Sequence, residues 1–252
     1  MNEVLLEIKD LYKNFGENKI HQGVNLKLKK GETIGLLGGS GTGKSVLLRS
    51  IIGLERINQG EIFFNQIKID NLSEQQLFKY RLKISYSFQN GALFDSLNVF
   101  ENIAYPLFEH SNFSFEEIEK KVKEILVLID LEGKELLMPS DLSGGMQKRV
   151  GMARSIIMNP EIILYDEPTA GLDPSNTVNI LNLMKKLKSR GHSSIFVTHD
   201  IPAAISLCDR ILVLNQGKVY FNGTPLEFRN SKDELILKFF TLNQFEAKRE
   251  NI

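Results

Sequence analysis

A glycine-rich run at residues 38–45, GGSGTGKS, has the residue types and the spacing to bind phosphate. Glycines let successive backbone N–H groups turn toward one anion, and a helix starting at Lys44 would add the partial positive charge of its N-terminus. The run follows a short apolar segment at 32–37, so it lies between an expected strand and an expected helix. We therefore expect the phosphates of a nucleotide to be held by Gly38, Gly39, Ser40, Gly41, Thr42, Gly43, Lys44, Ser45 and Val46.

Two side chains of this run have separate expected roles. The Lys44 ammonium would reach the β- and γ-phosphates, and the Ser45 hydroxyl would be a ligand of Mg²⁺. The competing interpretation is a glycine-rich turn that binds nothing. The strand and the helix expected on either side of the run disfavour that interpretation, because they supply the context of a phosphate-binding loop.

The segment 162–168, IILYDEP, places two carboxylates at the end of an apolar strand, where α/β folds build their ligand sites. Asp166 suits the coordination shell of Mg²⁺. Glu167, one residue later, points differently and is the candidate to orient or deprotonate an attacking water. These acids could instead cap the next segment, but the phosphate-binding run upstream favours the catalytic interpretation.

Two further segments carry residues with a possible part in the chemistry. The segment 141–158, DLSGGMQKRVGMARSIIM, predicts a helix that begins at Ser143. Helix capping by Ser143 would be a sufficient explanation, yet the two glycines beside it would also expose N–H groups as a second phosphate site. The residues alone leave both open. His199, at the end of FVTHD, is placed to hydrogen-bond a γ-phosphate or the attacking water. A single histidine is more often structural, but the position of His199 at the end of a strand favours the functional interpretation.

Short apolar segments must position these side chains. Residues 32–37, 162–165 and 194–198 are typical of buried parallel strands, and the last two are separated by a helical pattern at 175–190. Together these segments predict a parallel α/β core.

Outside that core, two other patterns are visible. Residues 24–28 alternate apolar and polar side chains, and 61–69 predicts a hairpin, so the N-terminal part would form strands. From about 98 to 158 the periodicity is helical, and one stripe of this region is expected to pack in the core: Phe115, Ile118, Val122, Ile125 and Ile129.

Composition excludes several classes of protein. The chain has 252 residues, 42% of them hydrophobic, and its 31 basic residues balance its 31 acidic ones, so no overall field would attract nucleic acid. The single cysteine, Cys208, rules out an internal disulfide and is expected to be an inert core residue in a reducing compartment. The N-terminus has no pattern of a signal peptide, and no window has the roughly 18 apolar residues of a spanning helix.

The order of the motifs, namely the phosphate loop, Gln89, LSGGM, ILYDEP, AGLD and His199, resembles the nucleotide-binding subunit of ABC transporters. The resemblance implies ATP and Mg²⁺ as cofactors and ATP hydrolysis as the activity. It implies that Phe15 stacks on adenine, that Gln89 senses Mg²⁺ and water, and that Asp173 links two sites. It also implies a head-to-tail dimer with two ATP molecules, in which Ser143, Gly144 and Gly145 close on the nucleotide of the other protomer.

The fold implied is an α/β P-loop NTPase of the ABC ATPase type, with a mainly parallel core sheet, an N-terminal antiparallel β subdomain and a helical insertion. The whole chain, 1–252, would be one ABC ATPase domain. Its nucleotide-binding core is expected at 1–88 and 160–230, its helical and signature subdomain at 89–159, and a C-terminal helical extension at 231–252. Whether that extension packs on its own core or contacts a second protomer or a regulator stays open.

The segment 86–107, YSFQNGALFDSLNVFENIAYPL, carries five aromatic rings and only two charges. With the motifs above, it resembles the ATPase of Mla-type, MCE-associated lipid transporters. That resemblance implies an integral membrane permease docking near Ala92 to Leu97, an MCE-domain protein, in some systems a STAS-domain regulator, and a peripheral place at the cytoplasmic face of the bacterial inner membrane. The alternatives are that the segment packs in its own subdomain, or that the chain serves an importer of a small solute such as an amino acid.

Overall fold

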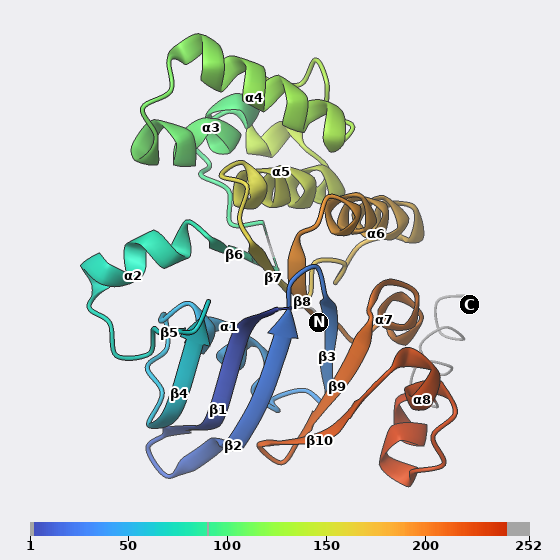
Figure 1. The fold of residues 1–252 in the computed structure, drawn as a ribbon. Coiled ribbons are helices and arrows are strands. Elements are labelled where there is room, and N and C mark those ends of the chain that lie inside the picture. Colours follow the sequence, from blue (N-terminus) through green and yellow to red (C-terminus); the bar gives the residue numbers. More distant parts are fainter. Residues whose placement is uncertain (1–2, 90, 241–252) are drawn as a thin grey trace. The chain divides into compact units, whose positions relative to one another are not determined.

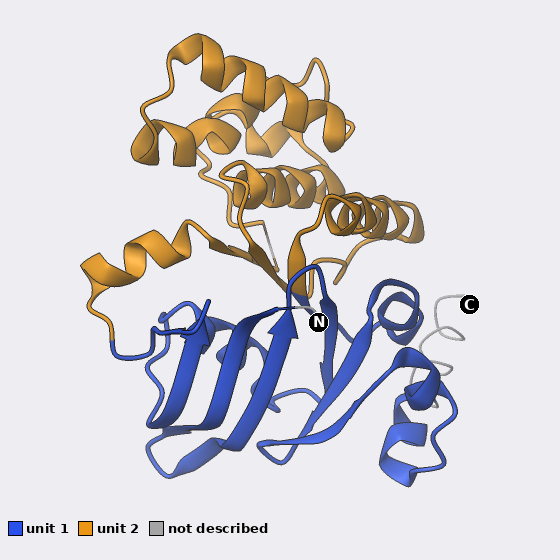
Figure 2. Ribbon diagram, in the orientation of Figure 1, with its two compact units in different colours: residues 1–71, 195–252 blue, residues 72–194 orange. Residues whose placement is uncertain are grey.

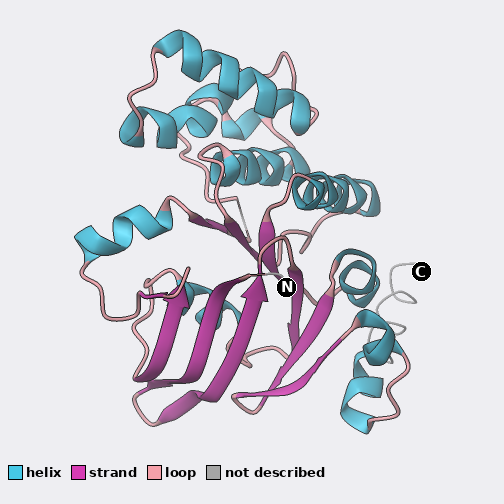
Figure 3. Cartoon of the chain, viewed as in Figure 1, coloured by secondary structure: helices cyan, strands magenta, loops and turns pink. Residues whose placement is uncertain are grey.

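The computed structural model describes residues 3–89 and 91–240, and the chain divides into two compact units (Figure 2). Unit 1 contains residues 1–71 and 195–252, and unit 2 contains residues 72–194. Unit 1 is built mainly of strands and unit 2 mainly of helices (Figure 3). The chain leaves unit 1 once and returns to it once, so unit 2 is an insertion within unit 1.

Unit 1 begins with an antiparallel sheet in the strand order β2-β1-β4-β5 (Figure 1). Its strands are β1 (Val4–Phe15), β2 (Asn18–Lys29), β4 (Gln59–Phe64) and β5 (Ile67–Lys68). The alternating residues of β2, Val24, Leu26 and Leu28, are all buried, as a half-buried strand requires. The pairing of Phe63 with Lys68 confirms the hairpin predicted from the sequence.

The remaining strands of unit 1 bring the phosphate loop to the end of a buried strand. Every residue of β3 (Thr33–Gly38) is buried, and β3 pairs in parallel with β9 (Arg210–Asn215), while β10 (Lys218–Gly223) pairs antiparallel with β9. Helices α1 (Lys44–Ile51), α7 (Ile201–Leu207) and α8 (Pro225–Arg229) also belong to this unit.

Cys208 lies directly after α7 and has 7% of its surface exposed. A Cβ atom added at Gly35 of β3 would lie 3.0 Å from the Cys208 sulfur. The cysteine therefore fills the core against β3, as the sequence predicts for an inert residue.

Unit 2 contains the parallel pair β6 (Ile84–Ser87) and β7 (Ile162–Asp166), and between them lie most of its helices. Between the two strands lie α3 (Val99–His110), α4 (Phe115–Leu128), the short 3-10 helix η1 (Pro139–Asp141) and α5 (Gly144–Ile156). Helix α2 (Glu74–Arg81) precedes β6, and α6 (Pro174–Ser189) follows β7. Strand β8 (Ser193–Val197) begins in unit 2 and ends in unit 1.

Local sequence explains where these helices begin. Ser73, Asn98 and Ser114 each cap a helix and form a capping box with a Gln or Glu three residues later. On α4, Ile118 and Val122 are buried as predicted, whereas Phe115 is 62% exposed and the prediction of a core position is wrong for it. Phe115 is the first residue of α4, so it lies at the end of the apolar stripe and remains largely on the surface. Its ring lies 6.0 Å from that of Phe100.

The fold class expected from the sequence is confirmed: parallel pairs, an antiparallel β part near the N-terminus and a helical insertion are all present. The subdomain boundaries drawn from the sequence stay predictions. Residues 234–240 are helical, and the rest of the expected extension, 241–252, lies outside the described residues.

Candidate functional site

The phosphate loop of unit 1 connects β3 to α1. Gly43 is the N-cap of α1 and has a φ of 90°, a left-handed conformation that favours glycine. The Thr42 hydroxyl donates to the Gly39 carbonyl at 2.9 Å, which tightens the turn. Gly39, Ser40 and Gly41 are exposed, so the backbone between β3 and α1 is accessible to a ligand.

Lys44 is held inside this loop. It is 6% exposed, and its ammonium donates to the carbonyls of Gly38 at 2.9 Å and Gly39 at 3.0 Å. A buried cation curled over the loop is placed to attract phosphate oxygens. Ser45 and Val46, the next two residues of α1, are half-buried.

Phe15 and His199 are the other expected site residues of unit 1. Phe15 ends β1 with 46% of its surface exposed, and the Lys13 ammonium lies 4.4 Å from its ring centre. An aromatic ring with this exposure is of the kind that stacks on a base. His199 follows β8 by two residues and is exposed.

The paired carboxylates of unit 2 stand at the end of β7, as the sequence predicts. Asp166 is 8% exposed and accepts a hydrogen bond of 2.5 Å from the Tyr86 hydroxyl on the neighbouring strand β6. Glu167 is half-buried and has a φ of 49°, a left-handed conformation that is costly for a residue with a side chain. The chain therefore leaves the extended conformation of β7 directly after Asp166.

The two glycines at the N-terminus of α5, Gly144 and Gly145, have different surroundings. The Ser143 hydroxyl accepts from the Met146 N–H at 3.3 Å, so it does cap the helix. A Cβ atom at Gly145 would lie 2.3 Å from Asn176, whereas one at Gly144 would meet nothing within 4 Å. Gly145 therefore has a packing role in the chain itself, while Ser143 and Gly144 are exposed.

Asp173 lies close to the N-terminus of α5, because Asn176 packs against Gly145 and also donates hydrogen bonds to Asp173. It caps α6 by accepting from the Asn176 N–H at 2.9 Å, and it also accepts from the Asn176 side-chain amide at 2.5 Å. These hydrogen bonds, the backbone one first, lower the pKa of Asp173. The structure thus brings together the two predicted motifs LSGG and AGLD.

Lys148 is a residue of this region that motif analysis did not single out. Its ammonium donates to the Ala170 carbonyl, in the loop that follows Glu167. Burial lowers the pKa of Lys148, and the nearby Glu167 carboxylate works against that shift. Lys148 therefore ties α5 to the loop that carries the candidate catalytic acid.

Gln89 is exposed and follows β6. The segment after it, 91–97, divides between surface and interior: Phe94 is 43% exposed, whereas Gly91 is buried. The ring of Phe94 lies 4.9 Å from that of Tyr105, and Phe108, three residues along α3 from Tyr105, is 47% exposed. We call Phe94, Tyr105 and Phe108 the aromatic patch.

Two polar side chains hold the segment 91–97, and sequence analysis missed both. Asn102 is fully buried, accepts from the Phe94 N–H at 2.9 Å and donates to the carbonyls of Phe94 and Leu97 at 3.1 and 2.8 Å. Arg154 of α5 donates to the carbonyls of Gly91 and Ala92 and to Asn102. An arginine within the apolar stretch VGMARSIIM was the available signal, but its partners are distant in sequence.

The segment 91–97 and α5 also touch through glycine. A Cβ atom at Gly151 of α5 would lie 2.6 Å from the Gly91 backbone. The segment 91–97 is therefore fixed to the same helix whose first residues are the LSGG motif.

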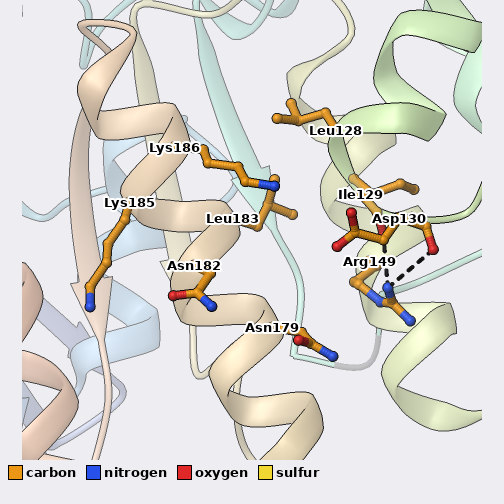
Figure 4. Close-up of a pocket in the computed structure, with 9 residues that line it drawn as sticks. All are labelled: Leu128, Ile129, Asp130, Arg149, Asn179, Asn182, Leu183, Lys185 and Lys186. Atoms are coloured by element: carbon orange, nitrogen blue, oxygen red, sulfur yellow. Dashed lines mark hydrogen bonds between the residues drawn. The ribbon is translucent and has the colours of Figure 1, made fainter.

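A cavity of about 330 Å³ lies in unit 2 between the C-terminal end of α4 and the middle parts of α5 and α6 (Figure 4). Arg149, one of its lining residues, donates to the Ile129 carbonyl at 2.9 Å. The cavity wall contains none of the expected site residues, so it gives no support to a role in nucleotide binding. Among the residues that the structure describes, no helix is both long and apolar enough to cross a membrane.

The expected site residues are divided between the units. Unit 1 contains the phosphate loop, Phe15 and His199, and unit 2 contains Gln89, Asp166, Glu167, Asp173 and the LSGG residues. The individual roles given to these residues stay predictions.

Comparisons with known proteins agree with the motifs. The model of the ABC transporter family matches residues 21–170. The chain is 38% identical over 258 residues to the chloroplastic protein TRIGALACTOSYLDIACYLGLYCEROL 3 of Arabidopsis thaliana, covering 95% of this chain and 74% of that one. It is 37% identical over 240 residues to the intermembrane phospholipid transport system ATP-binding protein MlaF of Haemophilus influenzae, covering 95% and 91%.

Other similar proteins broaden the range of cargo. The methionine import ATP-binding protein MetN of Carboxydothermus hydrogenoformans is 43% identical over 201 residues, which cover 79% of this chain and 59% of that protein. Among solved structures, the dimeric post-hydrolysis state of the ATP-binding cassette MJ0796, bound to ADP and Pi, has a TM-score of 0.81 at 36% identity, covering 88% of this chain and 99% of that one. The chain belongs to the ABC transporter family, as an ATP-binding subunit that hydrolyses ATP and resembles those of Mla-type systems.

Proposed function

We propose that this chain hydrolyses ATP to drive phospholipid transport, together with an integral membrane permease and an MCE-domain protein. The observation that carries the proposal is the similarity to MlaF, which extends over 95% of this chain and 91% of that protein. The exposed aromatic patch supports it, because a subunit that acts on a membrane partner needs a firm surface to dock on.

In the proposed site, residues 38–46 bind the phosphates of ATP and Phe15 stacks on the adenine. Ser45, Gln89 and Asp166 hold Mg²⁺, since hydroxyl, amide and carboxylate oxygens are ligands that this ion accepts. When bound, the ion neutralises charge on the phosphates. The buried Lys44 ammonium adds positive charge beside the same oxygens.

Glu167 is proposed to orient the attacking water and take up its proton, and His199 to hydrogen-bond the γ-phosphate or that water. The left-handed turn at Glu167 supports this assignment, since strained backbone persists where surrounding structure enforces it and is common at active sites. Lys148 holds the loop that follows and so restricts where the carboxylate can lie.

A second copy of the chain is the proposed partner for the exposed N-terminus of α5. Ser143 and Gly144 are exposed, and a Cβ atom at Gly144 would meet nothing within 4 Å. An accessible helix N-terminus of this kind can bind a phosphate held by another protomer. The dimeric state of MJ0796 supports this assembly. Asp173 would lie next to the shared nucleotide.

The permease is proposed to dock on Ala92 to Leu97 and the aromatic patch. Four exposed positions of this surface, Ala92, Phe94, Asp95 and Ser96, project from a segment that Asn102 and Arg154 hold rigidly. Movement of a docked element would therefore reach α5 and its LSGG residues without being absorbed by a loose loop. The subunit would be peripheral at the cytoplasmic face of the bacterial inner membrane, and a STAS-domain regulator is a possible further partner.

The second candidate function is import of a small solute, which the similarity to MetN favours. Isolation of the native complex through this chain would separate the two. Co-purification of a permease, an MCE-domain protein and phospholipid is the expected result. A permease with a periplasmic solute-binding protein, and no MCE-domain protein, would reject lipid transport in favour of import.

A further inference from the structure

A buried histidine on strand β2 contacts the phosphate loop. His21 of β2 is fully buried, and its Nε2 atom lies 3.1 Å from the carbonyl oxygen of Gly43, the residue before Lys44. Sequence motifs gave no reason to single out this histidine, because it lies 22 residues before Gly43 on a different element.

The chemistry of the contact fixes the state of the ring. A carbonyl oxygen only accepts hydrogen bonds, so Nε2 must carry the proton and donate it. Nδ1 is buried and has no hydrogen-bond partner among the described residues. A second proton on that nitrogen would bring an uncompensated charge into the interior. Burial accordingly lowers the pKa of His21 to about 4, with a smaller contribution from the Lys13 ammonium.

The contact also fixes a peptide plane of the phosphate loop. The peptide bond between Gly43 and Lys44 is planar and trans, so its C=O and its N–H point in opposite directions. The Gly43 carbonyl accepts from His21 and from the Leu47 N–H at 2.8 Å, which uses both of its lone pairs. Because that carbonyl is held toward His21 and Leu47, the Lys44 N–H must point in the opposite direction.

The strand and the loop meet without spare room at this point. A Cβ atom at Gly43 would lie 2.7 Å from His21 Nε2 and 2.5 Å from the Ile20 side chain. Gly43 can take up its left-handed conformation here only because it has no side chain. The histidine therefore has one position relative to the loop, and so does the peptide that it holds.

We infer that His21 is a positioning residue for phosphate binding: its Nε2–H holds the Gly43 carbonyl so that the N–H of Lys44 is aimed at the phosphates of the nucleotide. This inference rests on the phosphate-binding role proposed for residues 38–46. Its effect is on affinity for the diphosphate part of the nucleotide, so ADP and ATP are affected alike.

The test is a titration of the full-length chain with fluorescent ADP and Mg²⁺, in four variants. His21→Leu removes the donor and keeps an apolar side chain, and His21→Gln keeps an amide donor of similar reach. Val24→Ala removes buried volume from the same strand and so controls for lower stability. Lys44→Ala tests the loop itself. Unfolding midpoints without nucleotide show that each variant is folded at the temperature used.

We expect His21→Leu to weaken ADP binding about five- to tenfold, the loss typical of one hydrogen bond removed. His21→Gln should restore most of the affinity, and Val24→Ala should bind as the wild type does. Equal affinity of His21→Leu and wild type, an equal loss in His21→Gln, or an equal loss in Val24→Ala would overturn the inference. Unchanged binding by Lys44→Ala would instead reject the phosphate-binding role of the loop.

Discussion

Glu167 combines a left-handed backbone conformation with a proposed catalytic role. Its φ of 49° is a conformation that costs about 1 to 3 kcal/mol for a residue with a side chain. The preceding residue ends a fully buried strand and the next loop is tied to α5 through Lys148, so the surroundings hold the turn in place. A side chain presented in this way can act on a water that Asp166 does not contact.

Replacing Glu167 with Gln should leave ATP bound and reduce turnover by about two to four orders of magnitude, the contribution typical of a general base. The substitution keeps the size of the side chain and removes its ability to accept a proton. Phosphate release measures turnover, and nucleotide titration measures binding. Turnover close to that of the wild type would show that Glu167 is not the base.

His21 predicts how stability depends on pH. The folded pKa is about 4 and the unfolded value about 6.5. Because the folded pKa is lowered, the stability that neutral His21 contributes is fully present above about pH 6.5 and is lost as pH falls toward 4.

Between pH 7 and pH 5 the wild type should therefore lose roughly 2 kcal/mol of unfolding free energy that His21→Gln does not lose. Urea denaturation of both proteins at each pH measures the difference. The same pH dependence in the two proteins would show that His21 is charged, or solvated, in the folded state.

The sequence could predict those candidate site residues that belong to local motifs. Lys44 and Asp166 stand where a strand–loop–helix pattern and a strand end place them. His21, Asn102 and Arg154 could not be found in this way, because their importance comes from partners on other elements. Tyr86 is similar: its contact with Asp166 exists only because β6 and β7 are neighbours.

At the scale of elements, α5 connects the features that the account depends on. Its first turn carries Ser143 and Gly144, its middle carries Lys148 and Gly151, and Arg154 near its end holds the segment 91–97. A rigid helix with attachments at both ends transmits a displacement rather than damping it.

The two glycines at the start of α5 form a matched pair. Gly145→Ala should destabilise the chain by about 1 to 3 kcal/mol, because its Cβ would displace Asn176 and disturb the hydrogen bonds to Asp173. Gly144→Ala should leave the free energy of unfolding within about 0.5 kcal/mol of the wild type. Chemical denaturation of both variants checks this.

Gly144→Ala should nevertheless lower ATP hydrolysis, because the exposed position would contact the nucleotide of the partner protomer. Activity that stays at the wild-type level in a normally folded Gly144→Ala protein would argue against that contact.

A charge in the aromatic patch should separate docking from nucleotide binding. Phe94→Glu is expected to leave ATP binding by the free subunit unchanged, because Phe94 is 43% exposed and its neighbours are Tyr105 and Arg154. It should abolish co-purification with the permease. Phe115→Glu is the control, since Phe115 is also an exposed aromatic residue of unit 2 and lies outside the patch. Equal recovery of the permease with both variants would reject docking at Phe94.

The positions of strands and helices were predicted better than which of their residues are buried. The strands at 32–37, 162–165 and 194–198 and the helix at 175–190 were expected from short apolar runs, and each is found within one or two residues. The prediction that the apolar stripe of α4 is buried was wrong at Phe115. Periodicity shows which side of a helix is apolar, but it does not show how much of the helix length packs against other elements. The division of 91–97 into exposed and buried residues also depends on packing that the sequence does not show.

At the scale of the whole molecule, the chain is a unit built mainly of strands that is interrupted by a mainly helical one. The family is clear because motifs from both units occur in a fixed order, and relatives match over most of their length. The family does not by itself identify the cargo, because relatives with different cargo match this chain. The similarity to both MlaF and MetN reflects a shared ATP-hydrolysing part.

The most direct test of lipid transport is to follow phospholipid movement by the purified native complex in vesicles, with and without ATP. The account predicts that ATP drives movement of a fluorescent phospholipid with the wild-type chain, and that the same complex carrying Glu167→Gln moves none above the level without ATP. ATP hydrolysis by the wild-type complex without any lipid movement, or equal movement in the Glu167→Gln complex, would contradict it.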